Sequence, residues 1–338
     1  RRLPLRQRQE VQEVLRQSVT DRLPLAAALV SGLLLGLAFP PVGQSDAAWF
    51  ALVPLLMALK QATPRAGFRL AWCAGLVFWL GNLAWLWRLT GNGGPLPLVL
   101  VGHAALAAYC ALYAGLFGLA IAWLWRQTSI RNNPWLRVLM TVAVAPLLWA
   151  GSEWLRGTLL TGFAWNALGV SQYRNLALIQ CAAWGGASLV SAMLVAVNGG
   201  IALFLERLWS DARRSFRTAS ASGGTPTRFA LRSVELTIAL SIGVACWSAG
   251  LGRARDIDRA VRTAPVWRLA LFHPEAPSIF QQDDGAWEST LDALLANAQV
   301  AGAVAPDLCI WPETALPGAG PLDADTRQLA SNATALAG

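Results

Sequence analysis

The sequence has 338 residues, of which 55% are hydrophobic and only 14% are charged, and its formal net charge is +8. About a quarter of the residues in a soluble domain are charged, so this composition excludes a purely cytosolic globular enzyme. The 17 tryptophans and the excess of arginine instead indicate an integral membrane protein with basic loops and interfacial aromatic residues. The arginines are scattered between apolar runs and form no patch, which argues against a nucleic-acid-binding protein.

Seven apolar runs are candidates for membrane spans, because about 20 apolar residues cross the hydrocarbon layer of a bilayer. They follow a basic segment, residues 1–22, and together define a transmembrane domain at residues 23–250. The runs cover residues 23–40, 46–61, 67–88, 95–125, 135–155, 176–205 and 229–250. The first run ends in Phe39-Pro40-Pro41 with no small-x-small cleavage pattern, which favours an uncleaved anchor over a signal peptide.

The distribution of cationic residues predicts the orientation of these spans, because short loops rich in Lys and Arg stay in the cytoplasm. The N-terminal segment and the even-numbered loops hold 18 such residues. The odd-numbered loops before residue 250 hold only Arg88, Arg156 and Arg174. We therefore predict a cytoplasmic N-terminus, and seven spans would place everything after Gly250 on the opposite side of the membrane.

The remaining segment, residues 251–338, has the pattern of an α/β domain. Short apolar runs at Val266–Phe272 and Asp307–Trp311 predict buried strands, and the spacing of apolar residues in Trp287–Val304 predicts a helix. Strand, helix and strand in this order predict a βαβ unit with parallel strands. Two strands and one full helix cannot bury a two-sided sheet, so we expect only the beginning of this domain to be present.

Glu313 is the candidate catalytic residue. It comes directly after the second predicted strand, in the sequence Trp311-Pro312-Glu313-Thr314-Ala315-Leu316-Pro317, and open α/β sheets carry their chemistry just past the carboxyl ends of strands. A carboxylate that is desolvated there and fixed between two prolines suits a general base. The residues alone equally allow a turn or helix N-cap carboxylate, so both interpretations stay open at this point.

The cysteines predict neither a metal site nor a disulfide framework, and we expect no cofactor. Cys73, Cys110, Cys181 and Cys246 each lie inside an apolar run, where a thiol is usually a small packing residue. The sequence contains no C-x-x-C or other metal-ligand spacing. Cys309 lies in the second predicted strand of the C-terminal segment, and we expect it to be a buried packing residue too.

The stretch around Glu313 resembles the motif that holds the Glu of the Glu-Lys-Cys triad in the nitrilase superfamily. The membrane part resembles one branch of that superfamily, the apolipoprotein N-acyltransferase family. The most specific segments are Ala145–Trp149, Glu153–Gly157 and Thr161–Gln172, which are similar to the family's loop between spans five and six, and residues 37–41, 49–56 and 75–87 match more loosely. The resemblance implies an α-helical polytopic membrane domain of about seven transmembrane helices, followed by the start of a nitrilase-like α/β sandwich.

The resemblance also implies a reaction. In this family a phospholipid donates an acyl chain to a Cys, and the thioester then passes it to the N-terminal α-amine of a diacylglyceryl-modified apolipoprotein. By position, Glu313 corresponds to the general base. The implied location is the bacterial inner membrane, with the C-terminal domain in the periplasm.

Two members of the triad have no counterpart at the expected positions. Lys60 is the only lysine and belongs to a predicted cytoplasmic loop, and Cys309 precedes Glu313 by four residues, whereas the family's Cys follows far downstream. We therefore expect these 338 residues to be an inactive part of a longer enzyme. Where family members tend to show Gln-x-Asn, this chain has Phe272-His273-Pro274-Glu275, so no role is assigned to those side chains.

Four residues near the predicted outer end of the fifth span are candidates to face lipid or substrate: Glu153, Arg156, Phe163 and Trp165. The i,i+3 spacing of Glu153 and Arg156 favours an ion pair between them, although both would also suit a phosphate headgroup. The two aromatic residues, with Tyr173, belong either to the interfacial belt or to a path for lipid entry. His103 is expected to be a neutral side chain bonded to a neighbouring helix, the alternative being a relay group.

Two other functions compete with the acyltransferase. A multispan transporter or channel would place ionisable groups midway through its spans and would show paired repeats, and neither pattern is evident in the sequence. A catalytically inactive relative that binds lipoproteins stays open, because only a downstream Lys and Cys would distinguish it from the enzyme.

Overall fold

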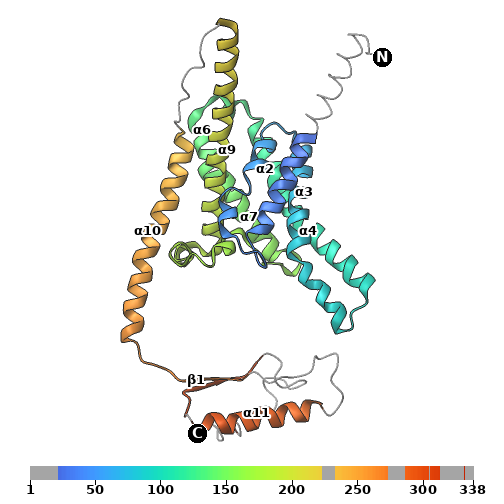
Figure 1. Ribbon diagram of the computed structural model, residues 1–338, viewed down its shortest axis with the longest axis vertical. Coiled ribbons are helices and arrows are strands. Elements are labelled where there is room, and N and C mark those ends of the chain that lie inside the picture. Colours follow the sequence, from blue (N-terminus) through green and yellow to red (C-terminus); the bar gives the residue numbers. More distant parts are fainter. Residues whose placement is uncertain (1–21, 223–232, 273–285, 304, 313–330, 332–338) are drawn as a thin grey trace. The chain divides into compact units, whose positions relative to one another are not determined.

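A computed structural model describes residues 22–222, 233–272, 286–303, 305–312 and 331 of the chain. The chain divides into two compact units. The first unit comprises residues 1–87 and 96–258, and the regular elements among its described residues are all helices (Figure 1). The second unit comprises residues 88–95 and 259–338 and contains a pair of parallel strands and a helix.

The described chain up to Thr263 contains both short and long helices. The α-helices are Arg22–Leu37, α2 (Val53–Leu59), α3 (Pro64–Asn82), α4 (Leu96–Trp125), α5 (Thr128–Asn132), α6 (Pro134–Leu139), α7 (Ala145–Thr158), α8 (Leu176–Ile179), α9 (Ala182–Ser222) and α10 (Val234–Thr263). The 3-10 segments are η1 (Ser45–Trp49), η2 (Ala84–Asn92), η4 (Leu159–Thr161) and η5 (Leu168–Gln172), and η3 (Met140–Val144) is π-helical.

Five helices among the described residues are long and apolar enough to cross a membrane. They cover Pro64–Gly91, Leu96–Trp125, Pro134–Thr161, Ala182–Ser215 and Val234–Thr263, and they coincide with the last five predicted spans. The first two predicted spans correspond to shorter apolar helices, Arg22–Leu37 and Ser45–Leu59. The mostly helical membrane architecture is therefore confirmed, and the total of seven spans stays a prediction. The last helix continues past the predicted end at residue 250 because the polar residues that follow it are good helix formers.

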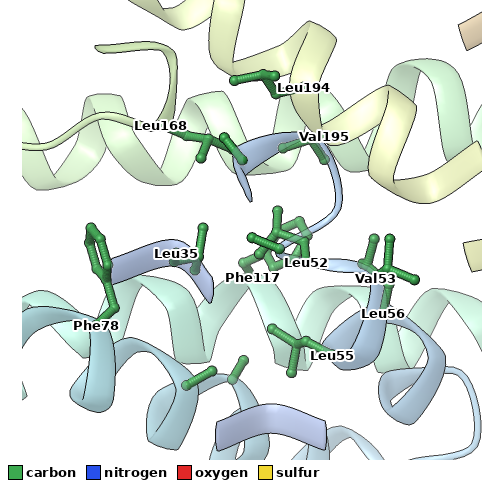
Figure 2. Packing of buried hydrophobic residues seen from close by; sticks show 14 of the residues in the cluster. Leu35, Leu52, Val53, Leu55, Leu56, Phe78, Phe117, Leu168, Leu194 and Val195 are labelled. Carbon is green, nitrogen blue, oxygen red and sulfur yellow. The ribbon is translucent and has the colours of Figure 1, made fainter. Parts of the chain in front are cut away.

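The long helix α9 is the centre of the first unit. In its most apolar stretch 67% of the residues are buried, compared with 22–44% in the other four long helices. Leu194 of α9 lies in one apolar cluster with Leu52, Leu55, Phe117 and Leu168, which come from three other parts of the chain (Figure 2). Packing against a shared central helix therefore joins segments that are distant in the sequence.

Helices α3 and α4 cross at glycine, which lets their backbones touch. A Cβ atom placed on Gly118 would lie 2.3 Å from Cβ of Ala71 and 2.5 Å from the carbonyl oxygen of Gly67. A Cβ atom on Gly67 would meet the carbonyl oxygen of Gly118 at 2.6 Å. Small residues at a crossing are typical of membrane helices, where close van der Waals packing replaces the hydrophobic effect as the source of association.

The broken segment Ser45–Leu59 is held by buried polar side chains of other helices. Asn198 of α9 accepts a hydrogen bond from the Leu52 amide (2.8 Å) and donates one to the Ala48 carbonyl (2.9 Å), and it is fully buried. The Ser31 hydroxyl accepts from the Leu55 amide at 2.9 Å. Irregular backbone at membrane depth needs such partners because no water is available there.

The second unit contains the predicted strand, helix and strand. Strand β1 (Leu269–Leu271) pairs in parallel with β2 (Leu308–Ile310), with Ala270 opposite Cys309, and α11 (Ala286–Gly302) lies between them in the chain. Both strands are shorter than the predicted apolar runs. The predicted βαβ order and the parallel pairing are confirmed, whereas Glu313 lies outside the described residues. That the unit is the beginning of a periplasmic domain stays a prediction.

Candidate functional site

The first unit contains a largely apolar pocket into which several polar side chains project. It is lined by residues of α3, α4 and α7 and by segments before α3 and after α7, and its cavity volume is about 40 Å³. The polar side chains in its lining include Tyr113, Ser152, Glu153, Arg156 and Asn166. Two of the four predicted lipid-facing residues, Glu153 and Arg156, therefore meet at one pocket.

Glu153 is positioned by α7 and joins that helix to the start of η5. Its Oε1 accepts hydrogen bonds from the Trp149 indole (2.8 Å), one turn earlier in α7, and from the Leu168 amide (2.7 Å). Its Oε2 is buried and has no hydrogen-bond partner within the described part of the chain. One carboxylate oxygen is thus used by the fold, and the other is a buried acceptor beside the pocket.

Arg156 holds the loop that follows α7. The residue is only 4% exposed, and its guanidinium donates to the carbonyl oxygens of Phe163 (2.7 Å) and Trp165 (2.6 Å) while lying 4.7 Å from the centre of the Trp79 ring. None of the ion pairs found in the described ranges joins Arg156 to Glu153, so the expected i,i+3 pair is wrong. The physical reason is that the backbone after α7 folds over the end of the helix, where its carbonyl groups bind the Arg156 guanidinium and one of its amides binds a single oxygen of Glu153.

The backbone of this loop is strained, which explains why it needs strong partners. Leu160, Thr161 and Asn166 have φ angles of 51°, 71° and 53°, in the left-handed region that costs a residue with a side chain about 1 kcal/mol or more. Gly162 has a φ of 79°, and a Cβ atom there would lie 2.1 Å from the Gly157 carbonyl oxygen. Strained backbone that the surroundings hold in place is common at functional sites.

Tyrosines of α4 also contact this loop. Tyr109 donates to the Leu159 carbonyl at 3.1 Å, so its oxygen accepts from the Tyr113 hydroxyl at 2.7 Å. Tyr113 lies in the pocket lining. The pocket and the loop are therefore linked through the phenol pair as well as through Arg156.

A row of aromatic rings leads from the pocket wall to the surface. Trp79, in the pocket lining, meets Phe163 edge-on at 5.8 Å, Phe163 stacks with Trp165 at 6.0 Å, and Trp165 stacks with Trp85 at 5.3 Å. Trp165 is 56% exposed, whereas Phe163 packs against the core. Tyr173 instead lies beneath the Arg174 guanidinium at 5.3 Å. Phe163 and Trp165 thus lie between the pocket and the exterior of the unit. This position is compatible with both predicted roles, the interfacial aromatic belt and a path for lipid entry.

His103 serves the fold outside this pocket. Its Nδ1 accepts from the Trp87 indole at 2.7 Å, and because an indole can only donate, the proton of the ring lies on Nε2 and is donated to the Leu80 carbonyl at 3.1 Å. The imidazole is therefore neutral and bonded to neighbouring segments, as predicted.

Sequence reasoning missed Trp79, Tyr113 and Trp149 as parts of the site. Trp79 and Trp149 lie in segments that resemble the family, and Trp149 also precedes Glu153 by four residues, which makes the two side chains neighbours on a helix. Cys309 is half-buried and packs against a small cluster around Phe272. No group of three or more His, Cys, Asp or Glu able to hold a metal occurs among the residues that the structure describes.

Comparisons with known proteins give a consistent result. Residues 31–200 match the family described as "Apolipoprotein N-acyltransferase N-terminal domain". Proteins named apolipoprotein N-acyltransferase are similar to the chain in Geobacter metallireducens (33% identity, covering 86% of this chain and 51% of the relative), Gloeobacter violaceus (35%, 65% and 40%) and Chromobacterium violaceum (29%, 87% and 50%). The chain thus spans about half the length of the curated relatives it matches.

Proposed function

Because the chain belongs to the apolipoprotein N-acyltransferase family, we propose that the protein transfers a fatty acyl chain from a membrane phospholipid to the N-terminal α-amine of a diacylglyceryl-cysteine apolipoprotein. The proposal places the protein in the bacterial inner membrane, with its N-terminus in the cytoplasm and its C-terminal unit in the periplasm. Phospholipid is the acyl donor and the lipid-modified apolipoprotein is the acceptor.

The observation that carries this proposal is the pocket of the first unit. An acyl donor is a lipid, and taking its chains out of the bilayer costs about 0.8 kcal/mol for each CH₂ group that is not buried again. The apolar lining of this pocket, among helices that can cross a membrane, would lower that cost for the part of an acyl chain that contacts it. Glu153, Arg156, Phe163 and Trp165 gather at this pocket and at its aromatic row, which supports their predicted lipid-facing role.

Glu313 is proposed as the general base of the covalent step. It would take the proton of a Cys thiol, the thiolate sulfur would attack the ester carbonyl, and the bond from that carbonyl to the glycerol oxygen would break to release a protonated lysophospholipid. A Lys ammonium would stabilise the oxyanion that forms in between. The amine of the apolipoprotein would then displace the sulfur, and the thiol would regain its proton.

The printed sequence contains one lysine, Lys60, and the structure pairs it with Glu206 in the first unit. We therefore propose that the catalytic Lys and Cys are supplied by further sequence of the longer protein. The 338 residues alone should bind phospholipid without forming a thioester, at Cys309 or at any other thiol.

The test uses a version of the protein that spans the full length of its relatives, in vesicles containing phosphatidylethanolamine with a labelled acyl chain. The initial rate of hydroxylamine-sensitive labelling measures thioester formation. Glu313→Gln should lower this rate by about 10²–10⁴-fold, because loss of a general base has that cost. Asp292→Asn, which neutralises an exposed carboxylate of α11, is the matched control and should leave the rate unchanged.

A second variant separates the pocket from the chemistry. Ser152→Phe adds a ring to the pocket lining and should raise the phospholipid concentration needed for half-maximal labelling by about tenfold, equivalent to about 1.4 kcal/mol. Leu147→Phe adds a ring to the exposed side of the same helix and should have little effect. Normal labelling in Glu313→Gln at normal membrane abundance would refute the catalytic assignment. Binding of lipid with no labelling in the full-length wild type would favour the inactive, lipoprotein-binding alternative.

A further inference from the structure

A second pocket of the first unit lies at the other end of α7. The helix begins at this pocket with Ala145 and ends at the first pocket with Arg156. The second pocket has a cavity volume of about 370 Å³. Lys60 directly follows α2 and Trp125 ends α4, and both residues lie at this pocket, on the side of the bundle that the arginine distribution predicts to be cytoplasmic.

The inner part of the second pocket is apolar. Its lining there includes the buried side chains of Leu56 in α2, Ile121 in α4, Met140 in η3 and Leu203 in α9, and Met57 lines a more exposed part. Burying apolar surface there would stabilise a bound molecule by about 25 cal/mol for each Å² removed from water. The pocket therefore suits a ligand with a hydrocarbon chain better than a small hydrophilic anion.

The mouth of the pocket carries cations that lie over indole rings. The Lys60 ammonium is 4.8 Å from the centre of the Trp125 ring and also forms an ion pair with Glu206. The Arg213 guanidinium is 4.8 Å from the centre of the Trp209 ring. Tryptophan beside a cation is typical of the headgroup level of a membrane, where an amphipathic ring meets both hydrocarbon and water.

Further cations surround the same mouth. Two neighbouring hollows share Lys60 and Glu206 with the pocket, and the three together are lined by seven cationic and two acidic side chains. A third carboxylate, that of Glu235, is buried and pairs with Arg207, one of the seven cations, so cations still outnumber carboxylates. One of the cations, Arg137, has a buried Nε atom with no hydrogen-bond partner in the part of the chain that the structure describes. The excess of positive charge and this unsatisfied donor both fit an anionic group at the mouth.

We propose that this pocket binds an anionic phospholipid of the cytoplasmic leaflet, with its phosphate at the cations around Lys60 and Arg213 and an acyl chain among the apolar residues of the inner part. Basic pockets between transmembrane helices on the cytoplasmic side are typical sites for anionic headgroups. A zwitterionic phospholipid would leave the cationic excess unneutralised, and free phosphate would leave the apolar part empty. This lipid is separate from the acyl donor proposed for the first pocket and does not depend on that proposal.

The test measures where two lipids attach to the full chain in nanodiscs of phosphatidylcholine. Trace phosphatidylglycerol or trace phosphatidylcholine carries a diazirine in one acyl chain, and peptide mass mapping after illumination locates the label. We expect labelling of the peptides that contain Met57, Met140 and Leu203 to be about fivefold greater from phosphatidylglycerol. One cation near an anionic headgroup contributes about 1 kcal/mol, so Arg213→Gln should lower this labelling about fivefold.

Two further variants make the result specific. Arg174→Gln removes an exposed guanidinium that also lies over an aromatic ring but is not part of this pocket, and it should leave the labelling unchanged. Ala202→Leu fills the apolar part and should reduce labelling at this pocket without changing labelling at the first pocket. Equal labelling by the two lipids, or an equal loss in Arg174→Gln, would overturn the proposal. Loss of the label when sodium phosphate replaces chloride at matched ionic strength would overturn it in favour of a free-phosphate site.

Discussion

Replacing Arg156 with Gln is the most direct test of how the candidate site is built. The guanidinium bridges the carbonyl oxygens of Phe163 and Trp165 and lies against Trp79. A Gln side chain is shorter and uncharged, so it cannot reproduce the two charge-assisted bonds. If Arg156 is a loop anchor, the variant should lose stability whether or not phospholipid is present.

The expected loss of stability in Arg156→Gln follows from the two carbonyl groups that the substitution leaves without a hydrogen-bond donor. A buried polar group without a partner costs about 1–3 kcal/mol, so two such groups cost about 2–6 kcal/mol. For a unit of this size, 1 kcal/mol shifts the midpoint of thermal unfolding by about 2–4 °C. The midpoint should therefore fall by at least about 4 °C. Both bonds come from one guanidinium nitrogen, Nη1, and a Lys ammonium keeps the charge and has three donors. Arg156→Lys should therefore lose less stability than Arg156→Gln.

The assay is thermal unfolding of the purified protein in detergent, followed by the fraction that stays monodisperse after heating. Arg69→Gln, which makes the same change at an exposed position of α3, is the matched control and should unfold within about 1 °C of wild type. A midpoint of Arg156→Gln equal to that of the control would refute the anchoring role. A loss seen only when phospholipid is added would instead favour the interpretation that Arg156 binds a headgroup.

Two further predictions concern the first unit and its orientation. Asn198→Ala should lower the unfolding midpoint by at least about 4 °C in the same assay, because it leaves two backbone groups of residues 45–59 unpaired. The control is Ser210→Ala, which removes a half-buried hydroxyl from the same helix and should leave the midpoint unchanged. Reporter fusions at Ser222 and Gly285 should report opposite compartments, cytoplasm and periplasm, because the cationic residues are concentrated in the even-numbered loops. Identical compartments would contradict the predicted topology.

Apolar length alone was enough to predict the long helices but not the short ones. The runs at 95–125 and 135–155 correspond to helices that are long and apolar enough to cross a bilayer. A continuous apolar run of about 20 residues is sufficient to predict such a helix. The run at 46–61 is shorter and contains Pro54, and it forms η1 and α2 with a break between them. Its path depends on partners from Ser31 and Asn198, which no local pattern in the run itself could reveal.

The membership of the candidate site was more predictable than its contacts. Resemblance selected Glu153, Arg156, Phe163 and Trp165, and the structure gathers these four around one pocket and its aromatic row. The expected ion pair failed because helical spacing considers only the partners that a helix itself provides. The loop after α7 provides backbone carbonyl groups that bind Arg156 and an amide that binds Glu153. Its left-handed residues are visible only in the folded chain.

The polar side chains of the first unit support a general point about assigning function inside a membrane. An ionisable or amide group among apolar spans is by default a functional candidate. Yet Asn198, His103 and Arg156 each satisfy backbone groups or a neighbouring side chain, in places where irregular structure would otherwise be left without partners. Glu153 differs, because one of its oxygens serves the fold while the other is a buried acceptor beside an apolar pocket. A buried acceptor without a partner costs free energy, and no group in the described part of the fold offsets that cost. Glu153 is therefore the most informative of these side chains to replace. The conservative substitution Glu153→Gln distinguishes a pocket that binds lipid from a void that is only structural.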